Sequence, residues 1–162
     1  MRLFGKDSKS DKVDELGNDW FLDEIRCCIG YHQMGDLASI IRRRREIASQ
    51  YAGALEGVNG ISLLKVPQEN YPSYYQFPVF LNQSVERKDL IESLKNKYGI
   101  TTKGIYRPCH QEKVFSKYDD STLRQTEETL NRSLCLPIFG QLSELEVQYV
   151  TDSLVNELKS RI

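Results

Sequence analysis

The chain has 162 residues, 40% of them hydrophobic and 28% charged, which is the composition of one folded domain with a substantial core. Its formal net charge is −1, so the chain as a whole lacks the charge for non-specific binding to nucleic acid or to an anionic membrane. No apolar run approaches the roughly 20 residues that span a bilayer, and residues 1–12 contain no apolar signal region, which predicts a cytoplasmic protein.

The first predicted helix follows a polar opening segment. Apolar residues recur three or four positions apart, or at sums of these spacings, from Ile25 to Leu55. This periodicity predicts one long helix or two consecutive ones. Glycine costs roughly 1 kcal/mol relative to alanine inside a helix, so a bend or break is expected near Gly30 and Gly35.

Short apolar or alternating segments predict four strands, over residues 61–66, 74–81, 100–106 and 134–139. Pro78 lacks a backbone N–H, so it is expected to place the second of these strands at a sheet edge or at a bulge.

Three more helices are predicted, over residues 84–99, over 119–133 and from Ser143 onward. Gly99 is expected to end the first of them. The residues expected to cap the helix starts are Asp19 or Asp23, then Ser84, then Ser143 with Glu146. Strands separated by helices predict an α/β sandwich.

Cysteine and histidine spacings raise the question of a zinc site. Cys28 and His32 lie one helical turn apart, and Cys109 precedes His110. Structural zinc is usually held by two tight ligand pairs, so core thiols and a surface histidine are the favoured interpretation. A Cys–His nucleophile would need an orienting group and an oxyanion hole that the sequence does not display. The cysteines expected to remain reduced thiols are Cys27, Cys28, Cys109 and Cys135.

No motif for nucleic acid or nucleotide binding is predicted. Residues 42–45 are four consecutive arginines, but on a helix such side chains fan around the axis and form no stripe. The ten glycines are scattered singly, which excludes a glycine-rich phosphate loop of the Rossmann or P-loop kind.

Several short motifs occur in order along the chain. Residues 17–28, "GNDWFLDEIRCC", lie over a "G-x-N-W/Y-R-M-S-E-x-x-A-A" helix entrance, and residues 74–79, "YYQFPV", over "Y-H-x-F-x-V". An Arg-Arg, Ala and Tyr helix pattern is matched by Arg44, Arg45, Ala48 and Tyr51. The next helix pattern is matched by Arg87, Leu90, Leu94, Gly99 and Ile100. A "Y-x-P-x-H" turn is matched by Tyr106, Pro108 and His110, and a closing "L-S-L-P-I-F" motif begins at Leu134.

This succession, over about residues 2–160, resembles the pyridoxal-phosphate (PLP) sugar aminotransferases of the DegT/DnrJ/StrS type. The resemblance implies that residues 19–162 form the small C-terminal domain of a fold-type I aminotransferase. Residues 1–18 would be a loop or the remnant of a linker from a missing large domain. The implied fold is an α/β (α+β) sandwich, with a long N-terminal helix and a small, largely antiparallel sheet covered by helices.

The resemblance further implies that the complete enzyme moves an amino group, from a glutamate-like donor, onto a nucleotide-linked keto sugar. The lysine that binds PLP would precede residue 1, because neither Lys103 nor Lys113 occupies its position. Without that amine the chain alone is expected to bind no cofactor and to be inactive. The implied partners are the lysine-bearing large domain, a second copy in a homodimer and the nucleotide-sugar substrate.

Five positions are singled out by the same resemblance. Asp19 stands where the family has an asparagine that reaches the PLP phosphate across the dimer interface, and Phe21 replaces an arginine. A carboxylate repels a phosphate, so Asp19 is a weak candidate for cofactor binding. Tyr106, His110 and Tyr75 are the candidate substrate-binding residues. The alternative is that Tyr106 only shapes a turn and His110 lies on the surface.

Three functions remain open from the sequence. The chain is part of a sugar aminotransferase, completed by an upstream segment. Alternatively it is a non-catalytic derivative that dimerises or binds a ligand, which Asp19 and Phe21 favour. The third candidate is a small zinc-binding domain.

Overall fold

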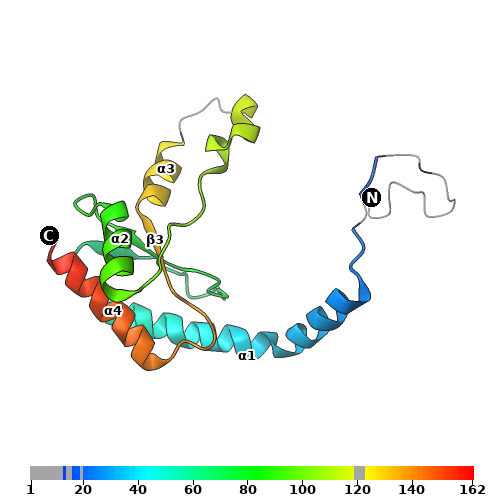
Figure 1. The fold of residues 1–162 in the computed structure, drawn as a ribbon, viewed down its shortest axis with the longest axis horizontal. Coiled ribbons are helices and arrows are strands. Elements are labelled where there is room, and N and C mark those ends of the chain that lie inside the picture. The colour runs from blue at the N-terminus through cyan, green and yellow to red at the C-terminus, as the bar shows by residue number, and fades with distance from the viewer. Residues whose placement is uncertain (1–12, 14–15, 19, 119–122) are drawn as a thin grey trace. The chain divides into compact units, whose positions relative to one another are not determined.

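The computed structural model describes residue 13 and residues 16–18, 20–118 and 123–162. Contacts divide the chain into two units, Met1–Ser39 and Ile40–Ile162. The helices and strands in chain order are α1 (Glu24–Leu55), β1 (Ile61–Leu63), β2 (Phe77–Leu81), α2 (Arg87–Tyr98), the 3₁₀ helices η1 (Cys109–Gln111) and η2 (Lys113–Tyr118), α3 (Arg124–Asn131), β3 (Ser133–Leu136) and α4 (Glu144–Lys159) (Figure 1).

Helix α1 is continuous through Gly30 and Gly35, so the alternative of two consecutive helices is wrong. Asp23 caps its start, because the Asp23 carboxylate accepts a hydrogen bond of 2.9 Å from the Arg26 backbone N–H. Asp19, the other expected cap, lies outside the described residues. Only the part of α1 in the second unit is buried, at Ile47, Ala48, Tyr51 and Leu55.

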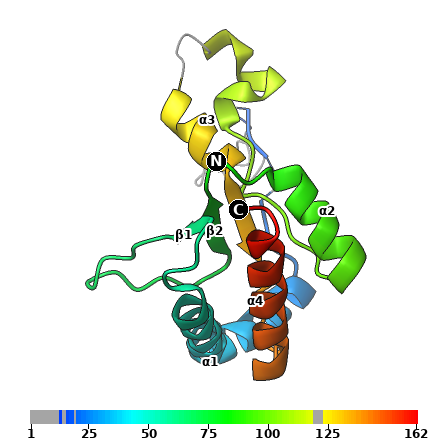
Figure 2. The same ribbon diagram turned by 90° about the vertical axis from the view of Figure 1, so that its left-hand side faces the viewer.

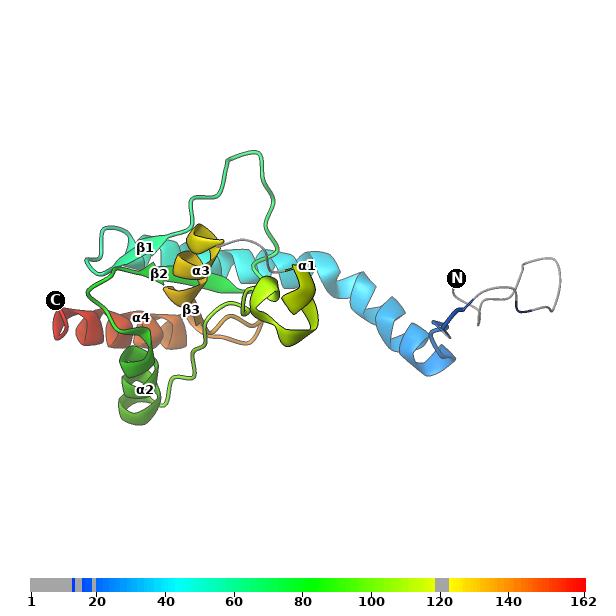
Figure 3. The same ribbon diagram turned by 90° about the horizontal axis from the view of Figure 1, so that it is seen from above.

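The three strands form one antiparallel sheet in the order β1-β2-β3 (Figure 3). This confirms the expected small antiparallel sheet. Alternate residues of β2 are buried, at Phe77, Val79 and Leu81, whereas all four residues of β3 are buried. β3 is therefore covered on both faces, as a short continuous apolar run predicts.

Pro78 lies in the central strand, so the prediction of an edge strand is wrong. The backbone directions in β2 explain why a proline is tolerated there. Leu81 donates its N–H to the β3 side, whereas Asn82 donates to the β1 side. By alternation, the backbone of Pro78 faces β1, and β1 ends at Leu63, opposite Val79. The missing N–H of Pro78 therefore costs the ladder no hydrogen bond.

The strand expected over residues 100–106 does not form. Lys103 makes a single antiparallel bridge with Cys135, in which the Cys135 N–H donates to the Lys103 carbonyl at 2.6 Å. The Ile105 N–H then donates to the Ser133 hydroxyl at 3.0 Å, so a side chain takes the place of the next ladder partner. The segment runs beside β3 without extending the sheet.

The core of the second unit lies between the sheet and the two long helices. Side chains of α1, β2, β3 and α4 form it together with α2, which packs against α4 (Figure 2). The side chains without measurable exposure in this core are Ile47, Tyr51, Val79, Leu90, Leu134, Leu154 and Leu158. Figures 1 and 2 place α3 with η1 and η2 on the far side of the sheet from α4.

With Asp23 at the start of α1, three of the four expected helix caps are confirmed. Ser143 and Glu146 form the expected capping box at the start of α4. Gly99 ends α2 with a φ of 69°, the left-handed conformation that favours glycine. Glu86, not Ser84, caps α2, because the Glu86 carboxylate accepts a hydrogen bond from the backbone N–H of Lys88, two residues further along the chain. The Ser84 prediction is therefore wrong by two positions.

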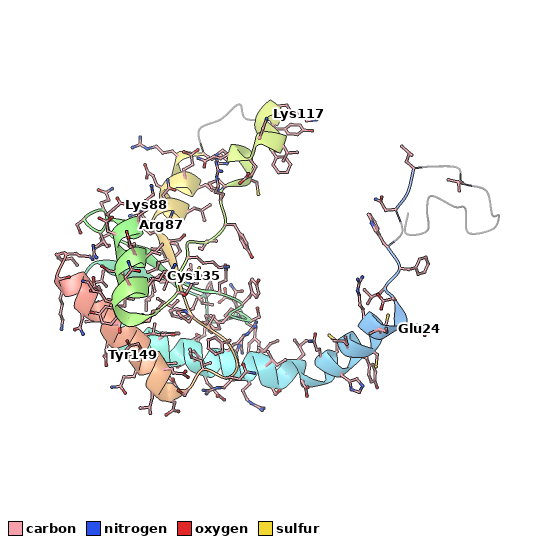
Figure 4. All side chains as sticks on the ribbon, in the orientation of Figure 1. Glu24, Arg87, Lys88, Lys117, Cys135 and Tyr149 are labelled. Carbon is pink, nitrogen blue, oxygen red and sulfur yellow. The ribbon has the colours of Figure 1, made fainter. Side chains whose placement is uncertain are left out.

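Two negative findings apply to the described part of the chain. None of its helices is long and apolar enough to cross a membrane. No cluster of three histidine, cysteine or acidic side chains there could hold a metal ion. The four cysteines are free thiols, and Cys135 is the buried one, on β3 (Figure 4).

Candidate functional site

A cavity of about 420 Å³ opens beside β3 in the second unit. It is within the range of about 300–1,000 Å³ that small-molecule sites occupy. Its walls come from α1, from the turn before β2, from the segment after α2 and from β3. The residues that line it are Arg44, Tyr75, Gln76, Thr101, Thr102, Lys103, Cys135, Leu136, Pro137 and Ile138.

Arg44 enters this cavity because of its place in the helical repeat. It precedes Ala48 by four residues, and Ala48, Tyr51 and Leu55 follow on the buried side of α1. A charged side chain therefore stands at one end of an apolar stripe, with its guanidinium carbon 6.0 Å from the centre of the Tyr75 ring.

The other arginines of residues 42–45 have different environments, because consecutive side chains on a helix point in different directions around its axis. Arg43 pairs with Glu46 at 3.1 Å, and Arg45 donates to the Pro72 carbonyl at 3.0 Å. Arg42 is exposed. The run is thus no single basic patch on one helix face.

Tyr106 is not among the residues that line this cavity, but it interacts with Tyr75, which is, although the two residues are 31 positions apart in the sequence. A hydrogen bond with Tyr75 raises the pKa of the Tyr106 phenol above its ordinary value. Both residues are exposed, at 65% for Tyr75 and 63% for Tyr106. Two of the three predicted substrate residues therefore form one pair of phenols at the surface.

The turn before β2 positions Tyr75. Tyr74 has a φ of 46°, a left-handed conformation that a bulky residue rarely adopts. The Tyr74 ring packs on Phe77 with centroids 6.1 Å apart, and Phe77 packs on the buried Tyr51 ring. Core packing therefore fixes the turn and directs the next residue, Tyr75, to the cavity.

His110 belongs to a separate contact. Its Nε2 lies 2.8 Å from the Glu127 carboxylate on α3, and only 15% of the His110 side chain is exposed. The pKa of Glu127 is lowered mainly by this hydrogen bond. His110 is thus a half-buried histidine held by an acidic partner, and whether it binds substrate or only shapes this part of the surface stays a prediction. None of the contacts found in the described residues joins it to Tyr75 or Tyr106.

The cavity residues alone do not suit PLP. Lys103 supplies an amine, but no carboxylate lines the cavity to face a pyridine nitrogen. Cys135 is nearby, and burial raises the pKa of its thiol while the Lys103 ammonium opposes this shift. Asp19, the predicted cofactor contact, lies outside the described residues.

Arg44 and Thr102 were not among the predicted site residues. Arg44 could have been predicted from the sequence, because it is a charged residue at a position of the helical repeat that Ala48 and Tyr51 continue on the buried side. No sequence pattern indicated Thr102, since its position depends on how the segment after α2 returns beside β3.

Comparison with known proteins adds the family. Residues 1–155 match the DegT/DnrJ/EryC1/StrS aminotransferase family. A dTDP-4-dehydro-2,3,6-trideoxy-D-glucose 4-aminotransferase from Saccharopolyspora spinosa is 29% identical over 152 residues. The match covers 93% of this chain and 38% of that relative, so the chain spans about two fifths of its length.

Solved structures show the same fold. The aminotransferase TlmJ from Streptoalloteichus hindustanus superposes with a TM-score of 0.87 at 25% identity, over 98% of this chain and 43% of the other. The PLP form of a putative sugar aminotransferase from Streptococcus pneumoniae gives a TM-score of 0.85 at 19% identity, over 99% of this chain and 42% of the other. Because the family match extends over nearly all of its residues, the chain belongs to the DegT/DnrJ/EryC1/StrS aminotransferase family.

Proposed function

We propose that the chain is the C-terminal portion of a PLP-dependent sugar aminotransferase and acts together with a lysine-bearing large domain. The observation that carries the proposal is the family match over residues 1–155, together with an alignment to a dTDP-sugar aminotransferase that covers only 38% of that relative. The lysine that binds the cofactor would lie in the remaining length. When bound, PLP supplies the electron sink for amino transfer.

In this proposal the chain forms one wall of the pocket for a nucleotide-linked keto sugar. Tyr75 and Tyr106 present two hydrogen-bonded, exposed phenols, which can both donate to and accept from sugar hydroxyls. His110 follows on the same segment and is held by Glu127. These three residues position the sugar, and the chain supplies no catalytic amine.

Other parts of the proposal concern the assembly. The complete enzyme is a homodimer in which residues 1–18 link to the large domain. Asp19 would approach the cofactor phosphate of the partner copy, either protonated or bridged by a cation. The cytoplasmic location predicted from the sequence belongs to the same proposal.

Co-expression tests this function. The chain is produced with the polypeptide encoded directly upstream, and the purified product is examined for the yellow PLP chromophore and for amino transfer to a dTDP-linked keto sugar. We expect colour and turnover from the pair and neither from the chain alone. A stable but colourless pair without turnover would contradict the proposal.

A second candidate, a non-catalytic derivative that dimerises, rests on Phe21. This aromatic residue is 65% exposed at the position where the sequence resemblance places an arginine. An exposed aromatic favours a protein contact over binding of a phosphate. Light scattering of the chain alone would then report a dimer without PLP, and a monomer would contradict this candidate.

A further inference from the structure

We propose that the cavity beside Arg44 binds an oxyanion, the phosphate or carboxylate group of a small-molecule ligand. The inference goes beyond the proposed function, because it requires only the chain itself and no catalysis. It rests on three features of the cavity: its charge, an unpartnered guanidinium nitrogen and an unpartnered buried hydroxyl.

The charge of the cavity is positive. Arg44 and Lys103 both line it, and no aspartate or glutamate does. Within the described residues, neither of these cations pairs with a carboxylate elsewhere. A bound anion would neutralise them.

The Arg44 guanidinium has a nitrogen that needs an acceptor. Its Nε is buried and has no hydrogen-bond partner. A buried donor without a partner costs free energy, because it has lost its hydrogen bonds to water. Guanidinium groups bind phosphate and carboxylate through two parallel N–H bonds, and the edge that includes Nε can offer such a pair. The anion would supply the missing acceptor.

Thr102 provides the independent observation. Only 7% of this residue is exposed, and its hydroxyl has no hydrogen-bond partner in the described structure. The residue lines the same cavity as Arg44. A threonine hydroxyl can donate to an oxyanion, so one ligand would satisfy both unpartnered groups.

The backbone holds these groups in place. The bridge between Lys103 and Cys135, with its 2.6 Å hydrogen bond, fixes the segment that carries Thr102 beside β3. Arg44 extends from the turn of α1 that precedes the buried Ile47 and Ala48. Both sides of the cavity are therefore anchored to the core, and binding needs only a local rotation of the Arg44 and Thr102 side chains to turn their buried polar atoms to the ligand.

Nuclear magnetic resonance of the isotope-labelled chain tests the proposal. Inorganic phosphate and succinate are titrated separately at matched ionic strength, with sodium chloride as the reference. We expect saturable shifts of the Arg44 Nε–H signal and of the Thr102 and Lys103 amides. A preference for phosphate or for succinate identifies which group the ligand carries.

Two variants and a control make the test specific. Arg44→Gln should weaken binding by about tenfold or more, the effect of losing a hydrogen bond to a charged group. Thr102→Val should weaken it less and leave the fold intact, because valine has the same shape as threonine. Arg42→Gln, an exposed arginine of the same run, should bind as the unmodified chain does.

Two results of the titrations would contradict the anion site. Shifts that do not saturate, or that sodium chloride reproduces, would overturn the proposal. So would equal binding by Arg44→Gln and Arg42→Gln. Because no step requires the large domain, failure here leaves the proposed aminotransferase function untouched, and failure of co-expression leaves this result untouched.

Discussion

The Tyr75 and Tyr106 pair shows how single side chains of distant segments define the candidate site. Their hydrogen bond raises the pKa of Tyr106 above the ordinary value of 10.0. The sequence identified both residues through the resemblance to the family. It could not identify their contact, because that depends on the turn at Tyr74 and on the bridge of Lys103 to β3.

A phenol titration tests this pair. Tyr75→Phe removes the hydrogen-bond partner, so the pKa of Tyr106 should fall toward 10.0. Carbon-13 spectra of labelled tyrosine, recorded against pH, measure the value for each ring. Tyr149→Phe is the control, since the Tyr149 hydroxyl donates to the Tyr98 carbonyl. An unchanged Tyr106 pKa in Tyr75→Phe would show that the two phenols do not interact.

Glu157 on α4 is a buried acid with a structural role. Its side chain is 4% exposed and pairs with Lys97 at 2.9 Å and with Arg161 at 3.1 Å. The hydrogen bond from Lys97, followed by that from Arg161, lowers the pKa of Glu157 from 4.5 to about 2 against the opposing effect of burial. Glu157 therefore stays charged in the folded state well below the pH at which it is protonated in the unfolded chain.

Replacing this acid should destabilise the protein in a pH-dependent way. Glu157→Gln should lower the free energy of unfolding at neutral pH by about 1.5–3 kcal/mol, the range for hydrogen bonds to charged groups. A depressed pKa stabilises the folded state above pH 4.5, and this contribution is lost as the pH falls from 4.5 toward 2.

Urea unfolding across this pH range measures the effect. The difference between the unmodified chain and Glu157→Gln should shrink toward acid pH. Asp152→Asn changes an exposed acid on the same helix and should have little effect at any pH. A difference for Glu157→Gln that is independent of pH would refute the assignment.

At the scale of helices and strands, the capping box of α4 gives a direct prediction. Ser143 accepts the Glu146 N–H, and Glu146 in return accepts the Ser143 N–H at 2.8 Å. Ser143→Ala should lower the free energy of unfolding by about 1 kcal/mol, because one N–H loses its acceptor. Chemical denaturation measures this, with the exposed mid-helix Ser49→Ala as the control. Equal stability of the two variants would contradict the cap.

The elements that the sequence predicted well are those with a local signal. α2 and α4 have caps and a helical repeat, and β3 is a short apolar run, so their positions follow from neighbouring residues. The segment over residues 100–106 has a β-like composition, but it forms no strand because the Ser133 hydroxyl replaces a ladder partner. That side-chain contact is long-range, and composition cannot indicate it.

Pro78 illustrates a second limit of local reasoning. Proline excludes a strand interior only where its backbone would face a paired neighbour. β1 ends one residue before that point, at Leu63 opposite Val79. The short length of β1 is therefore what allows a proline in the central strand. The candidate cavity has the same origin, since Arg44 and Thr102 meet only through the tertiary fold.

For the whole molecule, the central claim is that this chain builds part of an aminotransferase but contributes no cofactor-binding amine. The family match, and an alignment that covers only 38% of a relative's length, support the view that a larger domain supplies the cofactor-binding lysine. Lys103 is the amine that lines the cavity, and no carboxylate accompanies it there. The location of the PLP-bound lysine therefore distinguishes two cases. In one, this chain depends on a lysine of the large domain; in the other, it binds PLP through a lysine of its own.

Borohydride reduction of the co-expressed pair, followed by peptide mass spectrometry, makes that measurement. Reduction fixes PLP irreversibly on the lysine that holds it. The account predicts the pyridoxyl group on a lysine of the upstream polypeptide, with Lys103 of this chain unmodified. A pyridoxyl group on Lys103, or on any other lysine of the 162 residues, would contradict it.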